Sequence, residues 1–164
     1  MDHAIIDVLV DRLNGLMPRT AIVLGSGLGS LVDEVTDPIR IPYAEIPGFP
    51  ASAVSGHAGE VVAGYLGGQP ILMLAGRVHY YEQGNANAMR PAIEALAGIG
   101  VQSLILTNAA GSVRQDMPPG SVMQITDHIN YSGMNPLIGE ESDKRFVGMT
   151  SAYDADLSIA MRNA

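Results

Sequence analysis

The stretch Ile71–Gly84, ILMLAGRVHYYEQG, decides the fold that we predict for this chain. Its first half, Ile71–Ala75, is an unbroken apolar run, which is typical of a strand covered on both faces. If the strand continued, Arg77, His79 and Tyr81 would point to one face, because they stand two residues apart. Sheets of the α/β class bind ligands where such strands end. We therefore expect an oxyanion held by the guanidinium and the imidazole, with the phenol lying against something less charged. The alternative is an edge strand with a solvated face.

Two other predicted strands also end in loops suited to a ligand. Thr20–Leu24 (TAIVL) leads into residues 25–30 (GSGLGS), and Val101–Leu106 (VQSLIL) leads into residues 107–112 (TNAAGS). Glycines let backbone N–H groups turn toward an anion, and Ser26 adds a hydroxyl. If the three strands are parallel neighbours, all three loops meet at one edge of the sheet.

The glycine-rich loop also comes close to the dinucleotide-binding pattern G-x-G-x-x-G, and Glu45 lies at the usual distance beyond it. That interpretation fails on context, because the acid should end a second strand. Glu45 instead stands among Pro42, Pro47 and Pro50. An ordinary tight turn after the strand is the other interpretation of this loop.

The remaining pattern predicts one α/β domain over residues 1–164, with a mixed sheet flanked by helices. In the first half of the chain we expect a helix over 3–17 ended by Pro18, an irregular crossing over 38–50, a turn at Ser55–Gly59, and a hairpin of Glu60–Leu66 with Pro70–Ala75. A second helix should run from Asn85 or Asn87 to Ile99, with Ile93, Leu96 and Ala97 on its inner face. The rest of the chain should form a strand at Ser121–Ile125, a long loop over 131–150, and a helix at Ala155–Arg162 capped by Asp154.

Composition excludes several classes of function. A net charge of −8 argues against nucleic acid as a partner, since phosphate backbones demand a basic surface. No run of 18 apolar residues exists, so we expect no membrane span. With no cysteine, disulfides and cysteine nucleophiles are excluded. The acidic N-terminal segment does not suit a signal peptide, so the cytoplasm is the expected location.

The four histidines show no metal-ligand spacing, so we expect no metal site. His57 lies in SGHAG, where it could approach a ligand closely or stay solvated, and we expect His128 to be a structural hydrogen-bonding residue. No G-x-S-x-G is present and Ser26 has no evident base, which argues against a hydrolase triad.

Taken together, the motifs resemble the trimeric purine nucleoside phosphorylases, in family order from about residue 20 onward. They are GSGLG at 25–29, IPGFP at 46–50, SGHAG at 55–59, GRVHYYEQG at 76–84, TNAAGS at 107–112, DHIN at 127–130, NPL at 135–137 and AYD at 152–154. The resemblance implies phosphorolysis of purine (deoxy)ribonucleosides to a free purine and (deoxy)ribose 1-phosphate. It also implies a homotrimer that needs no metal or organic cofactor.

By the same resemblance, the phosphate would be bound by Ser26, His57, Arg77, His79 and the backbone of Ala109, and we expect Arg77, His79 and His57 to be catalytic. Tyr81 would lie against the sugar. Phe146 would reach the sugar pocket of the neighbouring subunit or, equally well, anchor its own loop. Gln83 and Ser112 depart mildly from the family pattern.

The family residues that grip the purine are expected beyond Ala164, so this chain resembles the N-terminal portion of such an enzyme. The sister methylthioadenosine phosphorylases are one alternative. A non-catalytic phosphate- or nucleotide-binding module is another, and the preferred purine stays open.

Overall fold

The computed structural model describes residues 3–51 and 59–164. The chain forms two compact units, Met1–Ala110 and Gly111–Ala164, and each is described by itself. The single domain expected over residues 1–164 stays a prediction.

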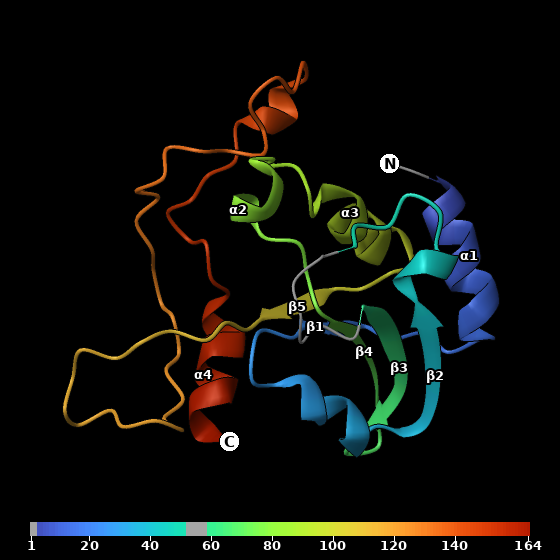
Figure 1. The fold of residues 1–164 in the computed structure, drawn as a ribbon, viewed down its shortest axis with the longest axis horizontal. Coiled ribbons are helices and arrows are strands. Elements are labelled where there is room, and N and C mark those ends of the chain that lie inside the picture. The colour runs from blue at the N-terminus through green and yellow to red at the C-terminus, as the bar shows by residue number, and fades with distance from the viewer. Residues whose placement is uncertain (1–2, 52–58) are drawn as a thin grey trace. The chain divides into compact units, whose positions relative to one another are not determined.

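The first unit is built on a five-stranded mixed sheet with the order β2-β3-β4-β1-β5 (Figure 1). Its strands are β1 (Thr20–Val23), β2 (Thr36–Pro42), β3 (Glu60–Leu66), β4 (Gln69–Ala75) and β5 (Ser103–Leu106). β1 pairs in parallel with β4 on one side and with β5 on the other, whereas β2, β3 and β4 pair antiparallel. The predicted mixed α/β sheet, including the hairpin of β3 and β4, is confirmed.

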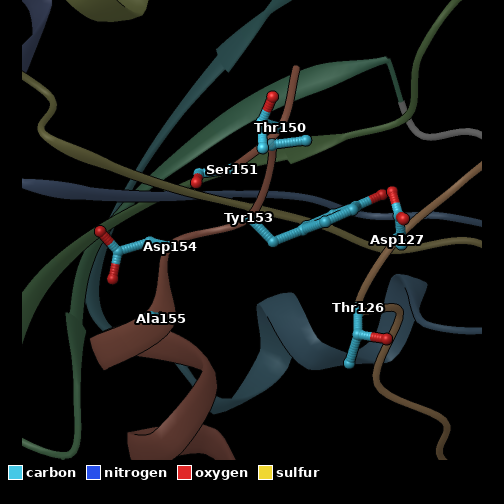
Figure 2. A pocket seen from close by; sticks show the side chains of 8 residues that line it. Thr126, Asp127, Thr150, Ser151, Tyr153, Asp154 and Ala155 are labelled. Atoms are coloured by element: carbon cyan, nitrogen blue, oxygen red, sulfur yellow. The ribbon is translucent and has the colours of Figure 1, made fainter. Parts of the chain in front are cut away.

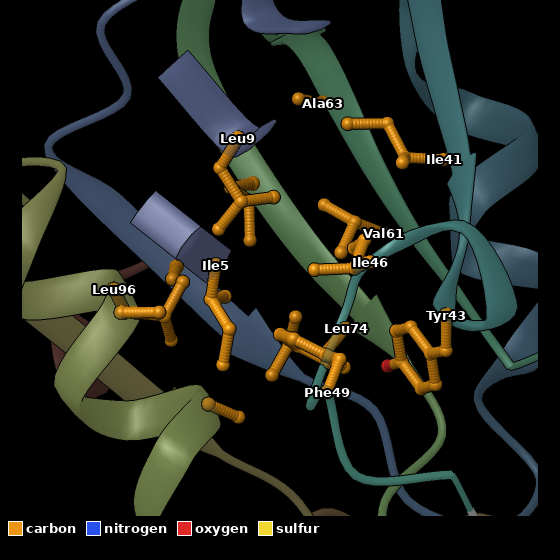
Figure 3. Close-up of a cluster of buried hydrophobic side chains, with 14 of the residues drawn as sticks. Ile5, Leu9, Ile41, Tyr43, Ile46, Phe49, Val61, Ala63, Leu74 and Leu96 are labelled. Carbon is orange, nitrogen blue, oxygen red and sulfur yellow. The ribbon is translucent and has the colours of Figure 1, made fainter. Parts of the chain in front are cut away.

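Alternate residues of β4 face opposite sides of the sheet, and both sides are covered, as the apolar run predicted. Leu72 and Leu74 join one buried cluster with residues of α1 (His3–Leu13) and α3 (Arg90–Gly98). Figure 3 shows Ile5 and Leu9 of α1 among the side chains that the sheet contributes to this cluster. Met73 and its neighbours on the other face pack with side chains of the 3₁₀ helix η1 (Gly29–Glu34). Apolar burial of this extent is the main stabilising contribution to the sheet.

The first helix is shorter than predicted. It ends at Leu13, because Asn14 and Gly15 adopt positive φ values of 48° and 87°, so the chain leaves the helix before Pro18. The inner face predicted for α3 was partly wrong. Leu96 is buried, but Ile93 is 38% exposed and Ala97 is exposed, while Ala92 and Ala95 are buried in their place.

The irregular crossing predicted over residues 38–50 was wrong for its first part. β2 pairs with β3 and tolerates Pro38 and Pro42 because it is the edge strand of the sheet. Beyond β2, the short 3₁₀ helix η2 (Tyr43–Glu45) and the following prolines keep the chain out of regular pairing, as predicted.

The second unit holds the 3₁₀ helix η3 (Asp143–Arg145) and the helix α4 (Ala155–Asn163). Asp154 caps α4 as predicted, because its carboxylate accepts a 2.8 Å hydrogen bond from the Leu157 N–H. The strand predicted at Ser121–Ile125 is not formed, since these residues pair with no strand. Residues 131–150 form a loop apart from η3, as predicted. None of the helices described in either unit has the length and apolar character that a bilayer crossing requires.

Candidate functional site

The three loops predicted to meet do follow parallel neighbouring strands. Val23 of β1 is aligned with Leu74 of β4 and with Leu106 of β5. Ser26, Arg77 and Ala109 each lie three residues beyond one of these aligned positions. The carboxyl ends of β4, β1 and β5 therefore present these residues at one edge of the sheet, where α/β folds bind ligands.

Thr107, the first residue after β5, connects the other two loops. Its Oγ1 accepts a 2.8 Å hydrogen bond from the Gly25 N–H, and its carbonyl oxygen accepts one from Arg77 Nη1. Gly25 is buried, and no larger residue fits there, because a Cβ at this position would lie 2.6 Å from the Thr107 carbonyl oxygen. The loops therefore meet through direct contacts at Thr107, a residue of the TNAAGS motif to which the sequence analysis gave no role of its own.

The local structure around Arg77 differs from the predicted strand. β4 ends at Ala75, and Gly76 adopts a φ of 121°, which turns the chain out of the sheet. The prediction that Arg77, His79 and Tyr81 point to one face of a continuing strand is therefore wrong. Arg77 is half-buried, and in the ranges 3–51 and 59–164 it forms no ion pair with a carboxylate.

His79 precedes the short helix α2 (Tyr80–Gln83) and is held by Glu82. The Glu82 carboxylate accepts a 2.6 Å hydrogen bond from the His79 backbone N–H and lies 3.2 Å from His79 Nδ1. A proton on Nδ1 completes this hydrogen bond, which orients the imidazole ring. The Tyr81 ring stacks on the imidazole, with 5.0 Å between ring centroids and 16° between the planes. Sequence reasoning missed Glu82, although its capping-box spacing three residues after His79 was a usable signal.

Tyr43 fixes the backbone just before Arg77. The buried Tyr43 hydroxyl donates a 2.8 Å hydrogen bond to the Gly76 carbonyl oxygen. The Tyr43 backbone N–H donates a 2.7 Å hydrogen bond to the Gly59 carbonyl oxygen. Burial, together with the nearby negative charge of Glu60, raises the pKa of Tyr43 well above its usual range. Sequence reasoning missed this residue too, since only the fold brings it to the end of β4.

The other predicted residues lie at three kinds of position. Ser26 and Ala109 are exposed on their loops, and His57 lies outside the described residues. Glu45, the acid that the dinucleotide pattern would need, forms a surface ion pair of 2.7 Å with Arg12. The binding and catalytic roles of Ser26, His57, Arg77, His79, Tyr81 and Ala109 stay predictions.

The second unit contains a polar pocket of about 370 Å³ beside the start of α4 (Figure 2). Figure 2 shows the Tyr153 ring extending across this pocket toward Asp127. The Tyr153 hydroxyl lies 3.2 Å from His128 Nδ1, which agrees with the structural role expected for His128. Because Asp127 and Asp154 both line the pocket, its charge does not suit a phosphate.

Phe146 lies in this second unit and is 75% exposed, with the Arg145 guanidinium 4.8 Å from its ring centroid. The described residues therefore do not bury it as a loop anchor, and its contact with a neighbouring subunit stays a prediction. Among the side chains that the structure describes, no three His, Cys, Asp or Glu residues gather in a way that could hold a metal ion.

The family model and the curated relatives that match this chain all belong to one family of phosphorylases. Residues 19–164 match the family model of the phosphorylase superfamily. The chain is 46% identical over 144 residues to purine nucleoside phosphorylase 1 of Bacillus subtilis, covering 86% of this chain and 53% of that protein. It is 40% identical over 153 residues to the purine nucleoside phosphorylase of Rattus norvegicus, covering 90% and 53%. The chain thus spans about half the length of these curated relatives.

Solved structures agree. The Schistosoma mansoni purine nucleoside phosphorylase in complex with BCX-34 matches with a TM-score of 0.81 and 31% identity, covering 99% of this chain and 63% of that one. Isoform 2 from Schistosoma mansoni, in complex with cytosine and ribose-1-phosphate, matches with a TM-score of 0.82 and 35% identity, covering 98% and 60%. The resemblance drawn from the motifs is confirmed.

Proposed function

Because the chain belongs to the phosphorylase superfamily, we propose that the protein catalyses the phosphorolysis of purine nucleosides. Inorganic phosphate attacks C1′ of the nucleoside, the bond from C1′ to the base breaks, and its electron pair leaves with the purine. The products are a free purine and a pentose 1-phosphate. The observation that carries this proposal is the alignment of Ser26, Arg77 and Ala109 beyond three parallel strands.

The phosphate site of this proposal is centred on Arg77. A guanidinium has five N–H donors, and the one bonded to Thr107 leaves others for an oxyanion. In a chain of net charge −8, attraction for an anion has to be built locally, and an arginine without a carboxylate partner in the described ranges supplies it. Ser26, His57, His79 and the Ala109 backbone complete the proposed set.

The proposed chemistry needs orientation more than acid–base work from this part of the chain. As the glycosidic bond breaks, positive charge builds on the sugar, and an aligned phosphate dianion both attacks and stabilises that charge. Arg77 and His79 orient the dianion, and the Glu82 contact fixes the imidazole that does so. The sugar, which carries less charge, contacts Tyr81 in this proposal, and the stacking of Tyr81 on His79 supports that role.

The finer proposals follow from the family resemblance. The protein acts as a homotrimer in the cytoplasm, Phe146 contacts the sugar pocket of the neighbouring subunit, and no metal or organic cofactor takes part. The purine contacts come from residues other than those predicted in this chain.

The test is release of hypoxanthine from inosine by the full-length protein, followed with and without inorganic phosphate. Turnover that requires phosphate supports the proposal. Phosphate binding in calorimetry without turnover of any nucleoside would instead identify a non-catalytic binding module. Turnover of methylthioadenosine but not inosine would assign the sister activity.

A further inference from the structure

Thr107 forms more hydrogen bonds between loops than its described neighbours at this edge of the sheet. Its polar groups bond to Val23 at the end of β1, to Gly25 in the loop after β1, and to Arg77 in the loop after β4. Its N–H and its hydroxyl both point to the Val23 carbonyl, at 3.1 Å and 2.9 Å. Its Oγ1 accepts from the Gly25 N–H at 2.8 Å, and its carbonyl accepts from Arg77. One residue thus links the ends of β1, β4 and β5.

The direction of each hydrogen bond follows from the chemistry of the partners. The Val23 carbonyl can only accept, so the Thr107 hydroxyl donates its single proton there. The Gly25 amide can only donate, so it occupies a lone pair of the same oxygen. The hydroxyl is therefore committed to the protein, which leaves Thr107 a role in holding neighbours rather than in touching substrate.

The two loops approach each other closely at Gly25. A Cβ on Gly25 would lie 2.6 Å from the Thr107 carbonyl oxygen and 2.8 Å from Asn108 Cα. The carbonyl that crowds Gly25 is the same one that receives Arg77. A shift of Thr107 would therefore move the glycine-rich loop and the guanidinium relative to each other.

We propose that Thr107 is a positioning residue for phosphate, whose hydroxyl holds residues 25–30 at the spacing from Arg77 that a single phosphate can bridge. This inference rests on the proposed function, which it deepens, because it assigns the geometry of the phosphate subsite to a residue that does not contact phosphate.

The experiment compares Thr107→Val, which removes the hydroxyl at nearly constant shape, with Thr107→Ser, which retains it. Thr36→Val is the matched control, since the Thr36 hydroxyl bonds the Tyr65 carbonyl on the β2–β3 pair.

Phosphate binding is measured by calorimetry in the full-length protein, kcat and both KM values by phosphorolysis of inosine, and folding by the melting temperature. We expect Thr107→Val to raise the Kd and KM of phosphate about tenfold, with the KM of inosine unchanged. Thr107→Ser and Thr36→Val should stay within about twofold of wild type.

Phosphate affinity equal to wild type in Thr107→Val would overturn the inference, as would equal losses in the valine and serine variants. An equal rise in both KM values would also overturn it, because that pattern indicates a general structural role. A wild-type protein that binds no phosphate would instead refute the proposed function, and the inference with it. If Thr107→Val does not fold, the inference is tested by hydrogen exchange of the Gly25 amide in the wild type. Slow exchange supports the hydrogen bond from this amide to Thr107, and exchange at the rate of an unstructured chain refutes it.

Discussion

The Tyr43 hydroxyl donates a 2.8 Å hydrogen bond to the carbonyl of Gly76, the residue directly before Arg77. Tyr43 is only 3% exposed, and its ring packs against Phe49 with 4.6 Å between centroids. A buried aromatic side chain therefore fixes the peptide from which the proposed phosphate-binding guanidinium extends.

Replacing Tyr43 by phenylalanine should retain the packing but leave the buried Gly76 carbonyl without this donor. We expect the free energy of unfolding to fall by about 1–3 kcal/mol, measured by urea denaturation. Tyr65→Phe, at a position 38% exposed on β3, is the matched control and should change stability by less than about 0.5 kcal/mol. Equal losses in the two variants would argue against the specific role of the Tyr43 hydroxyl.

The same residue predicts how stability depends on pH. Burial, and then the charge of Glu60, raises the pKa of Tyr43 in the folded protein, whereas a tyrosine in the unfolded chain titrates near 10. The unfolded state thus releases this proton first, so the contribution is fully present below about pH 10 and is lost as the pH rises further. Urea denaturation between pH 9 and about 11 should show a steeper loss of stability in wild type than in Tyr43→Phe. Parallel curves would contradict the burial effect.

Removing the guanidinium in Arg77→Ala should weaken phosphate binding by about 2–3 kcal/mol, as expected for losing charge-assisted hydrogen bonds. Arg19→Ala is the matched control. Arg19 bonds to Gln102 at the N-terminal ends of β1 and β5, away from the strand ends that carry the proposed phosphate site. Calorimetry with inorganic phosphate distinguishes them. An unchanged phosphate affinity in Arg77→Ala would remove this residue from the site.

Gly25→Ala tests the close contact between the β1 and β5 loops. The added Cβ would meet the Thr107 carbonyl at 2.6 Å, so the backbone must shift, at a cost of about 1–3 kcal/mol. Gly29→Ala in the same loop is the matched control, since its Cβ would have nothing within 4 Å. Thermal unfolding should show a lower melting temperature for Gly25→Ala alone, and a similar change in both variants would refute the steric argument.

Much of the sheet could be predicted from local pattern, because strands buried on both faces carry uninterrupted apolar runs such as Ile71–Ala75. The loops that end three of these strands could be placed at one edge because parallel strands share their direction. The conformation after β4 could not be predicted, since alternation looked intact through Tyr81 while Gly76 turned the chain and α2 followed.

The supporting residues were beyond sequence reasoning for a different reason. Thr107 and Tyr43 act through contacts with residues distant in the chain, so no short pattern predicts these roles, although Thr107 itself lies in the TNAAGS motif. β2 escaped prediction because its prolines are tolerated only at an edge, and edge position is a property of the assembled sheet.

The threonine link also bears on how the chain folds. Gly25 and Thr107 are 82 positions apart, so closing this contact requires a large loss of chain entropy before any ligand can be bound. Topologies dominated by such distant pairings fold slowly. Phosphate should therefore slow unfolding rather than accelerate folding, because the groups that would bind it come together only when the parallel strands have already formed.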